Sequence, residues 1–385
     1  MSQPIHKPAR VLFLFSDTGG GHRSASEAII ESLKLEYGGR IEMEMVDIFK
    51  DYAPPPFSYS PEIYPRMAYF PEVWRFGYNL SNGNRQARAV TALLLPYLRR
   101  SARRLIREHP AELIVSVHPL ANGTFLRVLG ERHTPFITVV TDMVTTHALW
   151  YHYKADKVLV PTPVALERGL TYGLSMQQLE VVGLPVAQRF TQPPGNKAEL
   201  REKLGWPQGC PVVLLVGGGE GMGPVERTAH AIDASGLKLA LMMIAGRNRG
   251  LQDRLEGYAW RGPAKVYGFV HEMPDFMRAA DVLVTKAGPG TISESFIAGL
   301  PMILFSRMPG QEDGNVAYVV NEGAGVWAPH AEQVVATLRN WLEHPERMER
   351  TATACKRLAR PDSSRQIARI IAETLGISTP TRSEA

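Results

Sequence analysis

The sequence has few cysteines and no long apolar run. Its 385 residues include two cysteines, Cys210 and Cys355, which lie far apart and in no spacing typical of metal ligands. A disulfide framework or a zinc site is therefore not expected, and a reducing, cytosolic setting fits best. No stretch approaches the roughly 20 apolar residues of a membrane-spanning helix. The apolar run at 11–15 has the length of a strand, too short for a signal-peptide core. We expect a cytoplasmic protein that is soluble or sits on a membrane surface.

The chain is only mildly basic, with a net charge of +5, so the position of the charges is more informative than their sum. Eight arginines and no acidic residue lie between Arg75 and Arg107. Most of them fall in a predicted amphipathic helix over 91–108, whose start we expect Pro96 to delay or kink. A basic patch can bind nucleic acid, but no recognised nucleic-acid module is present. We therefore predict no nucleic-acid partner.

Residues 51–84 show neither clear helical nor clear strand periodicity. An insertion of this length inside a compact domain is usually functional or disordered, and its aromatic content argues against disorder. The prolines and aromatic residues of the insertion are Pro54, Pro55, Pro56, Phe57, Tyr59, Tyr64, Tyr69, Phe70, Trp74, Phe76 and Tyr78.

Apolar runs of strand length alternate with helical periodicity along the chain, which is typical of an α/β protein. The expected strands are 11–15, 41–46, 113–117, 136–141, 157–160 and 180–182, then 212–216, 240–245, 266–269, 282–285 and 302–304. They predict two doubly wound, Rossmann-like domains, residues 1–188 and 189–375, with 376–385 as a flexible tail. Ligands bind such sheets outside the carboxyl ends of the strands, so we expect a cleft between the two domains.

A glycine-rich loop directly follows the first strand. It reads Ser16-Asp17-Thr18-Gly19-Gly20-Gly21-His22-Arg23. The glycines permit close approach of a ligand and offer N–H groups at a helix N-terminus. The loop fits neither the G-x-G-x-x-G dinucleotide fingerprint nor the G-K-[ST] of a P-loop. His22 can serve as a general base near neutral pH, or it can be an ordinary surface or capping histidine.

Polar residues also follow two later strands of the first half. The strand at 136–141 runs into Asp142 and on to Trp150, and the strand at 113–117 runs into His118. Asp142 can orient His22, bind an acceptor or cap a helix. Trp150 can line a channel for the acceptor or belong to the core.

The second half repeats the pattern of a strand followed by a glycine loop, here Gly217–Gly223. The strand at 282–285 then leads into Lys286-Ala287-Gly288-Pro289-Gly290-Thr291-Ile292-Ser293-Glu294. Glu294 near the start of a helix suits two ribose hydroxyls, or it balances the helix dipole. Gln311 and Glu312 offer donors and acceptors to the hydroxyls of a sugar.

Four segments together resemble the monogalactosyldiacylglycerol synthases and the related diacylglycerol glucosyltransferases. They are SDTGGGHRSASEAI, VVTDMVTTHALW, KAGPGTISE and PGQEDGN, and the resemblance covers most of residues 11–330. It implies the GT-B fold, a UDP-hexose donor with galactose favoured, and a 1,2-diacylglycerol acceptor. It also implies that His22 deprotonates the acceptor hydroxyl, supported by Asp142. The residues that the resemblance places on the acceptor side are Gly20, Gly21, His118 and Trp150.

The donor site implied by the resemblance lies in the second domain. Glu294 would bind the ribose, Gln311 and Glu312 the hexose, and Phe269 and Val270 would flank the uracil. The other donor-binding candidates are Gly218, Gly219, Lys286, Gly290, Thr291 and Asn315.

No D-x-D motif, which metal-dependent single-domain glycosyltransferases usually need, occurs in the chain. We therefore expect no metal and no cofactor, since loop amides and helix N-termini can stabilise the departing UDP. A single displacement would invert the anomeric centre. The aromatic insertion and the arginine-rich helix indicate a peripheral contact with a membrane and its anionic lipids. They can alternatively form a buried lid and a solvated basic face.

Three other functions remain open at this point. A diacylglycerol glucosyltransferase, or an enzyme with another lipid acceptor, would share the motifs. A non-hydrolysing UDP-sugar epimerase would share the architecture, but it fits the TGGGH and PGQE segments poorly. A UDP-sugar-sensing membrane scaffold would have lost catalysis.

Overall fold

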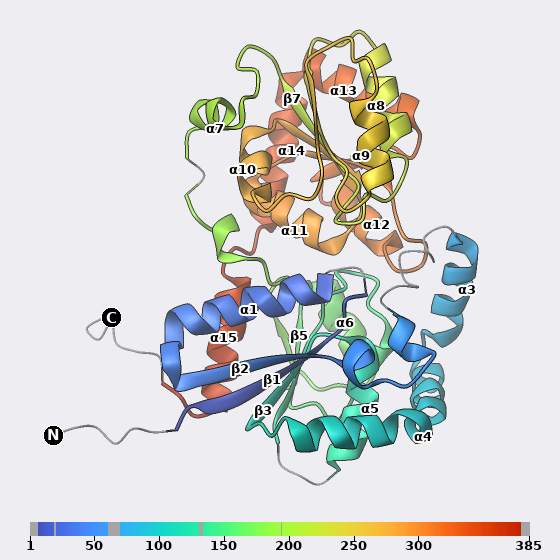
Figure 1. Cartoon of the computed structure of the whole chain (residues 1–385), viewed down its shortest axis with the longest axis vertical. Coiled ribbons are helices and arrows are strands. Elements are labelled where there is room, and N and C mark those ends of the chain that lie inside the picture. Colours follow the sequence, from blue (N-terminus) through green and yellow to red (C-terminus); the bar gives the residue numbers. More distant parts are fainter. Residues whose placement is uncertain (1–6, 19–20, 61–69, 131–133, 194, 379–385) are drawn as a thin grey trace, which may run out of the picture. The chain divides into compact units, whose positions relative to one another are not determined.

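Two parallel six-stranded sheets organise the chain (Figure 1). The structure is a computed structural model that describes residues 7–18, 21–60, 70–130, 134–193 and 195–378. The chain divides into two compact units, residues 1–188 with 362–385, and residues 189–361.

The first sheet has the order β2-β1-β3-β4-β5-β6. Its strands are β1 Ala9–Phe15, β2 Ile41–Asp47, β3 Leu113–Ser116, β4 Phe136–Val139, β5 Lys157–Val160 and β6 Leu179–Val181. Successive residues of β1 are buried on opposite faces: Phe13 packs with helix α1, Gly21–Tyr37, and Leu14 packs with the core that α4, Asn84–Glu108, and α5, Pro119–Leu129, help to form. Burial on both faces explains why inner strands such as β1, β3 and β4 read as largely apolar runs.

The second sheet has the order β12-β11-β10-β7-β8-β9. Its strands are β7 Val212–Val216, β8 Ala240–Ile244, β9 Ala264–Tyr267, β10 Val282–Lys286, β11 Met302–Ser306 and β12 Gly325–Trp327. The helices of this unit are α7 Lys197–Leu204, α8 Val225–Ala234, α9 Arg249–Glu256, α10 Met273–Ala279, α11 Pro289–Ala298, α12 Asp313–Asn321, α13 Ala331–Glu343 and α14 Pro345–Leu358. The sequence analysis did not predict β12, a three-residue edge strand beside β11.

The last helix, α15 Ser363–Thr374, corrects the predicted domain boundary. Residues 362–375 were assigned to the second domain, but α15 packs on α1 in the first unit. Ile367 and Ile371 of α15 are buried in one cluster with Ile29 and Leu33 of α1. Of the predicted tail, Ile377 is partly buried against this cluster, and 379–385 lie outside the described residues.

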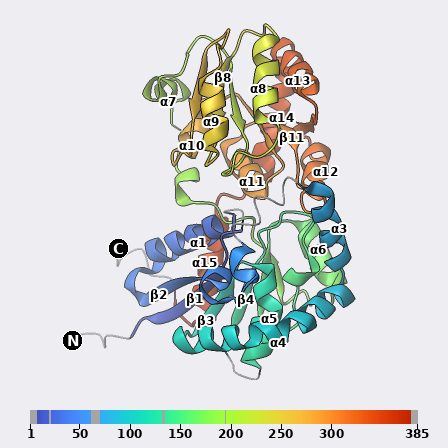
Figure 2. The same cartoon turned by 45° about the vertical axis from the view of Figure 1, so that its right-hand side comes forward.

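The insertion between β2 and β3 is more helical than predicted. Short turns at Ile48–Tyr52 and Phe57–Tyr59 precede α3 Pro71–Ser81 and α4 Asn84–Glu108 (Figure 2). Tyr64 and Tyr69 lie outside the described residues. The helix expected from residue 91 begins at Asn84 instead and continues through Pro96, which lies on its exposed side. Two further helices, α5 Pro119–Leu129 and α6 Pro163–Thr171, complete the first unit.

Candidate active site

The strand order of each unit defines a point where polar loops converge. Strand β1 lies beside β3 in the first sheet, and β7 lies beside β10 in the second, so the chain reverses direction across the sheet at both places. In doubly wound sheets, ligands bind outside the carboxyl ends of the strands at this switch point. The loops after these four strands carry His22, His118, the glycine loop 217–223 and the segment beginning at Lys286.

His22 lies at the start of α1 and is a partly exposed residue. Its Nδ1 is 2.9 Å from the hydroxyl of Thr141. Burial lowers the pKa of His22 to about 4, although a hydrogen bond to the Val117 backbone and the charge of Asp47 act in the opposite direction. The imidazole is therefore neutral at physiological pH, the form that can accept a proton.

His118 is buried beside His22, with the two ring centroids 4.7 Å apart. The N–H of Leu120 donates to Nδ1 of His118, which makes this histidine the N-cap of α5. The proton of the neutral ring is then on Nε2, which donates to the hydroxyl of Thr18 at 3.2 Å. Burial and the neighbouring His22 hold the pKa of His118 well below its ordinary value. Because the ring of His118 is buried against His22, the structure does not support the predicted contact of His118 with an acceptor.

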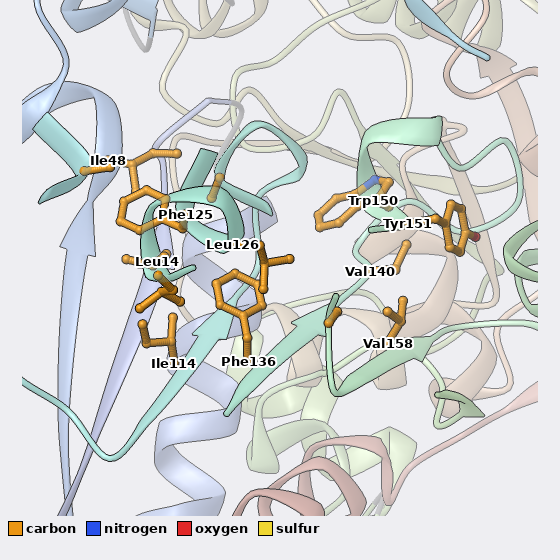
Figure 3. Close-up of a cluster of buried hydrophobic side chains, with 14 of the residues drawn as sticks. Leu14, Ile48, Ile114, Phe125, Leu126, Phe136, Val140, Trp150, Tyr151 and Val158 are labelled. Atoms are coloured by element: carbon orange, nitrogen blue, oxygen red, sulfur yellow. The ribbon is translucent and has the colours of Figure 1, made fainter. Parts of the chain in front are cut away.

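Trp150 is completely buried in the core of the first unit, where Figure 3 shows it with Val140 and Val158. The prediction that it lines an acceptor channel is not supported, and the alternative of a core tryptophan agrees with its position. Its indole Nε1 donates to Oδ2 of the buried Asp142 at 2.7 Å. The hydroxyl that contacts His22 belongs to Thr141, one residue before Asp142. Thr141 was not among the site residues predicted from the sequence.

The glycine loop after β1 is described only in part. Gly20 lies outside the described residues. Gly21 is exposed at the start of α1, and a Cβ added there would meet no atom within 4 Å. Among described residues, the backbone near His22 is thus open to an approaching molecule.

The glycine loop of the second unit is a tight turn that requires glycine. Gly218 has a φ of +74°, and a Cβ on Gly217 would lie 2.7 Å from the backbone of Gly221 and Met222. A Cβ on Gly218 would lie 3.2 Å from Cε of Lys286. The loop after β7 and the end of β10 are thus in direct contact.

Lys286 lies at the centre of a polar cluster at this edge of the sheet. Its Nζ is 2.7 Å from Oε1 of Glu312, whose other oxygen accepts a hydrogen bond from the N–H of Met308 at 2.7 Å. Asn315 donates to the carbonyl of Ala287, and its Oδ1 is buried without a hydrogen-bond partner among the described atoms. Gln311, next to Glu312, is partly exposed. The structure therefore brings Lys286, Glu312 and Asn315 together.

Helix α11 contributes both an anion-binding end and a carboxyl group. Gly290 and Thr291 lie in its first turn, where N–H groups have no acceptor within the helix and can bind an anion. Glu294 follows about one turn later and is partly exposed. Burial raises the pKa of Glu294 to about 7, against the opposing effect of Arg189. Its carboxyl group therefore titrates near neutral pH.

Phe269 and Val270 follow β9, which ends at Tyr267, earlier than predicted. Phe269 is 47% exposed, and the guanidinium of Arg247 lies 4.4 Å from the centre of its ring. The sequence analysis missed Arg247, although it follows β8 at the same edge of the sheet as the other loops.

Over the residues that the structure describes, no three or more His, Cys, Asp or Glu side chains group in a way that could hold a metal ion. None of the described helices is long and apolar enough to span a membrane.

Comparison with known proteins identifies the family. Residues 22–186 match the model for monogalactosyldiacylglycerol synthase, and residues 212–367 match the glycosyltransferase family 28 C-terminal domain. A probable monogalactosyldiacylglycerol synthase of Glycine max is 36% identical over 369 residues, which cover 93% of this chain and 70% of that protein. The chain belongs to the monogalactosyldiacylglycerol synthase family. Synthase 1 of Arabidopsis thaliana is 35% identical, with 93% of this chain and 69% of that protein covered.

The solved structures agree with the fold of this synthase-family member. MurG of Acinetobacter baumannii has a TM-score of 0.61 at 14% identity, over 95% of this chain and 100% of that one. MnaA of S. aureus, solved with UDP, has a TM-score of 0.63 at 14% identity, over 97% and 99% of the two chains. These matches confirm the predicted GT-B fold, and family membership makes the chain a glycosyltransferase rather than an epimerase.

Proposed function

We propose that the protein transfers galactose from UDP-galactose to the free hydroxyl of a 1,2-diacylglycerol, giving a β-linked monogalactosyl lipid. The observation that carries this proposal is a neutral, partly exposed His22 at the switch point of the first sheet, in a member of the monogalactosyldiacylglycerol synthase family. The identity of the sugar and of the lipid acceptor is inferred from the names of the relatives.

The mechanism we infer is a single displacement without metal. His22 accepts the proton of the lipid hydroxyl while the oxygen attacks the anomeric carbon. The bond from that carbon to UDP breaks, and UDP leaves with the electron pair. Attack opposite the leaving group inverts an α-linked donor to a β-linked product. Amides of the 217–223 loop, the N-terminus of α11 and Lys286 would stabilise the negative charge on UDP.

The donor contacts we propose use side chains that the structure already orients. Glu312 is held by Lys286 and by the N–H of Met308, and we propose that its carboxylate binds hexose hydroxyls together with Gln311. The Oδ1 of Asn315, which has no hydrogen-bond partner among the described residues, is available for a further hydrogen bond. Glu294 would accept from the ribose hydroxyls.

The test is an incubation of the purified protein with diacylglycerol vesicles and UDP-galactose or UDP-glucose, with and without EDTA. We expect a monohexosyl lipid by mass spectrometry, faster with UDP-galactose and unaffected by EDTA. A preference for UDP-glucose would make the protein a diacylglycerol glucosyltransferase. UDP binding without any lipid product would favour the sensing scaffold, and inhibition by EDTA would contradict the metal-free mechanism.

The pH dependence of turnover provides a separate test of His22. Because the pKa of His22 is lowered from 6.5 to about 4, its deprotonated form persists well into the acid range. At saturating donor, we expect kcat to stay level from about pH 7 to about pH 5.5 and to fall only below that. The measurement is a kcat profile at several pH values. A half-maximal point near pH 6.5 would contradict the environment assigned to this ring.

We further propose that α3 and α4 bind the surface of an anionic membrane. Val73, Phe76 and Leu80 of α3 are 61%, 70% and 64% exposed, and their spacing places them on one side of the helix. Leu93 and Tyr97 of α4 are also exposed. The arginines of the same segment are Arg75, Arg85, Arg88, Arg99, Arg100, Arg103, Arg104 and Arg107. Apolar side chains flanked by cations suit an interfacial helix on anionic lipid.

Part of the insertion resembles the alternative of a buried lid, because Phe57 packs against the core of the first unit. Tyr78 is buried, and its hydroxyl donates to the carbonyl of Thr145. The insertion is therefore held to the first unit through Phe57 and one side of α3, while the opposite side of α3 stays exposed.

Replacing Phe76 and Leu80 by serine should weaken binding to vesicles that contain an anionic lipid. Each side chain that leaves water on insertion contributes on the order of 1.5 kcal/mol or more, so we expect at least about a tenfold rise in the dissociation constant. Vesicle co-sedimentation measures it. Leu35→Ser is the control, because Leu35 is 67% exposed on α1, outside this surface. Equal binding by the double variant and the control would contradict the proposed surface.

A further inference from the structure

Arg247 lies beside the proposed donor site, but neither the family resemblance nor the mechanism gives it a role. Its Nη1 is 2.7 Å from Oε1 of Glu220, which belongs to the glycine loop. The same guanidinium covers the ring of Phe269 at 4.4 Å. The Arg247 and Glu220 side chains are 53% and 27% exposed, so water and ligands can reach the pair.

The backbone fixes Arg247 against the glycine loop independently of its side chain. The N–H of Arg247 donates to the carbonyl of Gly219 at 2.8 Å. Gly246 has a φ of +61°, and a Cβ there would lie 2.3 Å from the same carbonyl oxygen. Replacing the Arg247 side chain therefore leaves this contact in place, which makes a clean test possible.

Two cations flank the start of the glycine loop. A Cβ on Gly219 would lie 3.5 Å from Nη1 of Arg247, and one on Gly218 would lie 3.2 Å from Cε of Lys286. Each cation is paired with a carboxylate at 2.7 Å, Arg247 with Glu220 and Lys286 with Glu312.

The two carboxylates differ in how firmly they are held. Glu312 is buried and accepts a second hydrogen bond, from Met308. Glu220 has Arg247 as its hydrogen-bond partner among the described residues and is more exposed. A surface ion pair of this kind contributes little free energy. Glu220 is therefore the carboxylate that an incoming anion can displace.

We propose that Arg247 binds the diphosphate of the UDP-sugar donor by exchanging the Glu220 carboxylate for it. The inference rests on the proposed function, because it takes a UDP-sugar as the ligand of this loop. A guanidinium offers a planar fork of N–H donors that matches phosphate oxygens, and such charge-assisted hydrogen bonds are the stronger ones. Glu220 neutralises the Arg247 cation before the donor binds and competes with the donor's diphosphate. The pair therefore sets the affinity for the donor.

The test is the dissociation constant of UDP-galactose, measured by calorimetry. Arg247→Met should raise it about tenfold or more, because hydrogen bonds to charged groups are lost. Glu220→Gln should lower it about threefold, because the competing charge is removed. Uridine, which has no phosphate, should bind the wild type and both variants equally. The matched control is Arg254 with Glu226, a pair at 2.8 Å with 56% and 33% exposure, where Arg254→Met and Glu226→Gln should change little.

The outcomes separate this inference from the proposed function. Wild-type binding of UDP-galactose with no change in Arg247→Met would overturn the role of Arg247 alone. An equal loss of uridine and UDP-galactose binding would show that Arg247 only supports Phe269, which also overturns the diphosphate contact. A wild-type protein that binds neither UDP-galactose nor UDP-glucose would overturn the proposed function and this inference with it.

Discussion

His22→Gln is expected to lower kcat for hexose transfer by about 10²–10⁴-fold while leaving the affinity for UDP-galactose unchanged. The amide of glutamine can still hydrogen-bond to Thr141, which is 2.9 Å from Nδ1 of His22, but it cannot accept the proton of the lipid hydroxyl. Initial rates with diacylglycerol vesicles measure kcat, and calorimetry with UDP-galactose measures donor binding.

His118→Asn is the control for this prediction. An asparagine can still accept the N–H of Leu120 and cap α5, as His118 does now. We expect a smaller loss of kcat, because His118 is buried and packs against His22 instead of taking the proton. Equal losses in the two variants would contradict the assignment of His22 as the general base.

Glu294→Gln is expected to weaken UDP-galactose binding and to abolish its dependence on pH. The ionised carboxylate accepts from ribose hydroxyls better than the neutral group does. Since the pKa of Glu294 in the free protein is raised to about 7, the affinity of the wild type should fall as the pH drops below 7, by at most about tenfold per pH unit and towards that of the variant, and reach a plateau above about pH 8. Titrations at several pH values measure both curves.

UDP-galactose is the suitable ligand here because its diphosphate is esterified at both ends and has no proton to lose near pH 7. At pH 8 we expect the dissociation constant of Glu294→Gln to be at least about tenfold above that of the wild type. Glu322→Gln is the control, since it removes a carboxylate that is paired with Arg357 elsewhere in the unit. A pH dependence that persists in Glu294→Gln would show that another group titrates.

Most of each sheet could be predicted because the inner strands are buried on both faces. The run at 11–15 contains no polar residue, as expected for a strand with both faces buried, so this apolar run by itself predicts the strand β1. The same logic does not place helices. Ile367 and Ile371 show that α15 has an apolar side. The sequence does not indicate whether this side packs on α1 of the first unit, as it does, or on a helix of the second unit.

The candidate site was predictable where function coincides with a strand end. The segments that carry His22 and Lys286 lie at the ends of strands at the switch points, and Glu312 follows β11, the strand beside β10, so motif and topology agree. Contacts between loops were not predictable. Trp150 reads equally well as a channel residue or a core residue until its burial against Asp142 is seen. Arg247 belongs to no motif, and its contact with Glu220 depends on the backbone path of two separate loops.

The anomeric configuration of the lipid product tests the central claim most directly. We would isolate the lipid formed from UDP-galactose and diacylglycerol and record its proton NMR spectrum. A β-galactosyl diacylglycerol, with the large coupling between axial protons at the first two carbons of the sugar, is the result that inverting transfer predicts. An α-linked product would contradict the single displacement through His22, even if the acceptor and the sugar were those proposed.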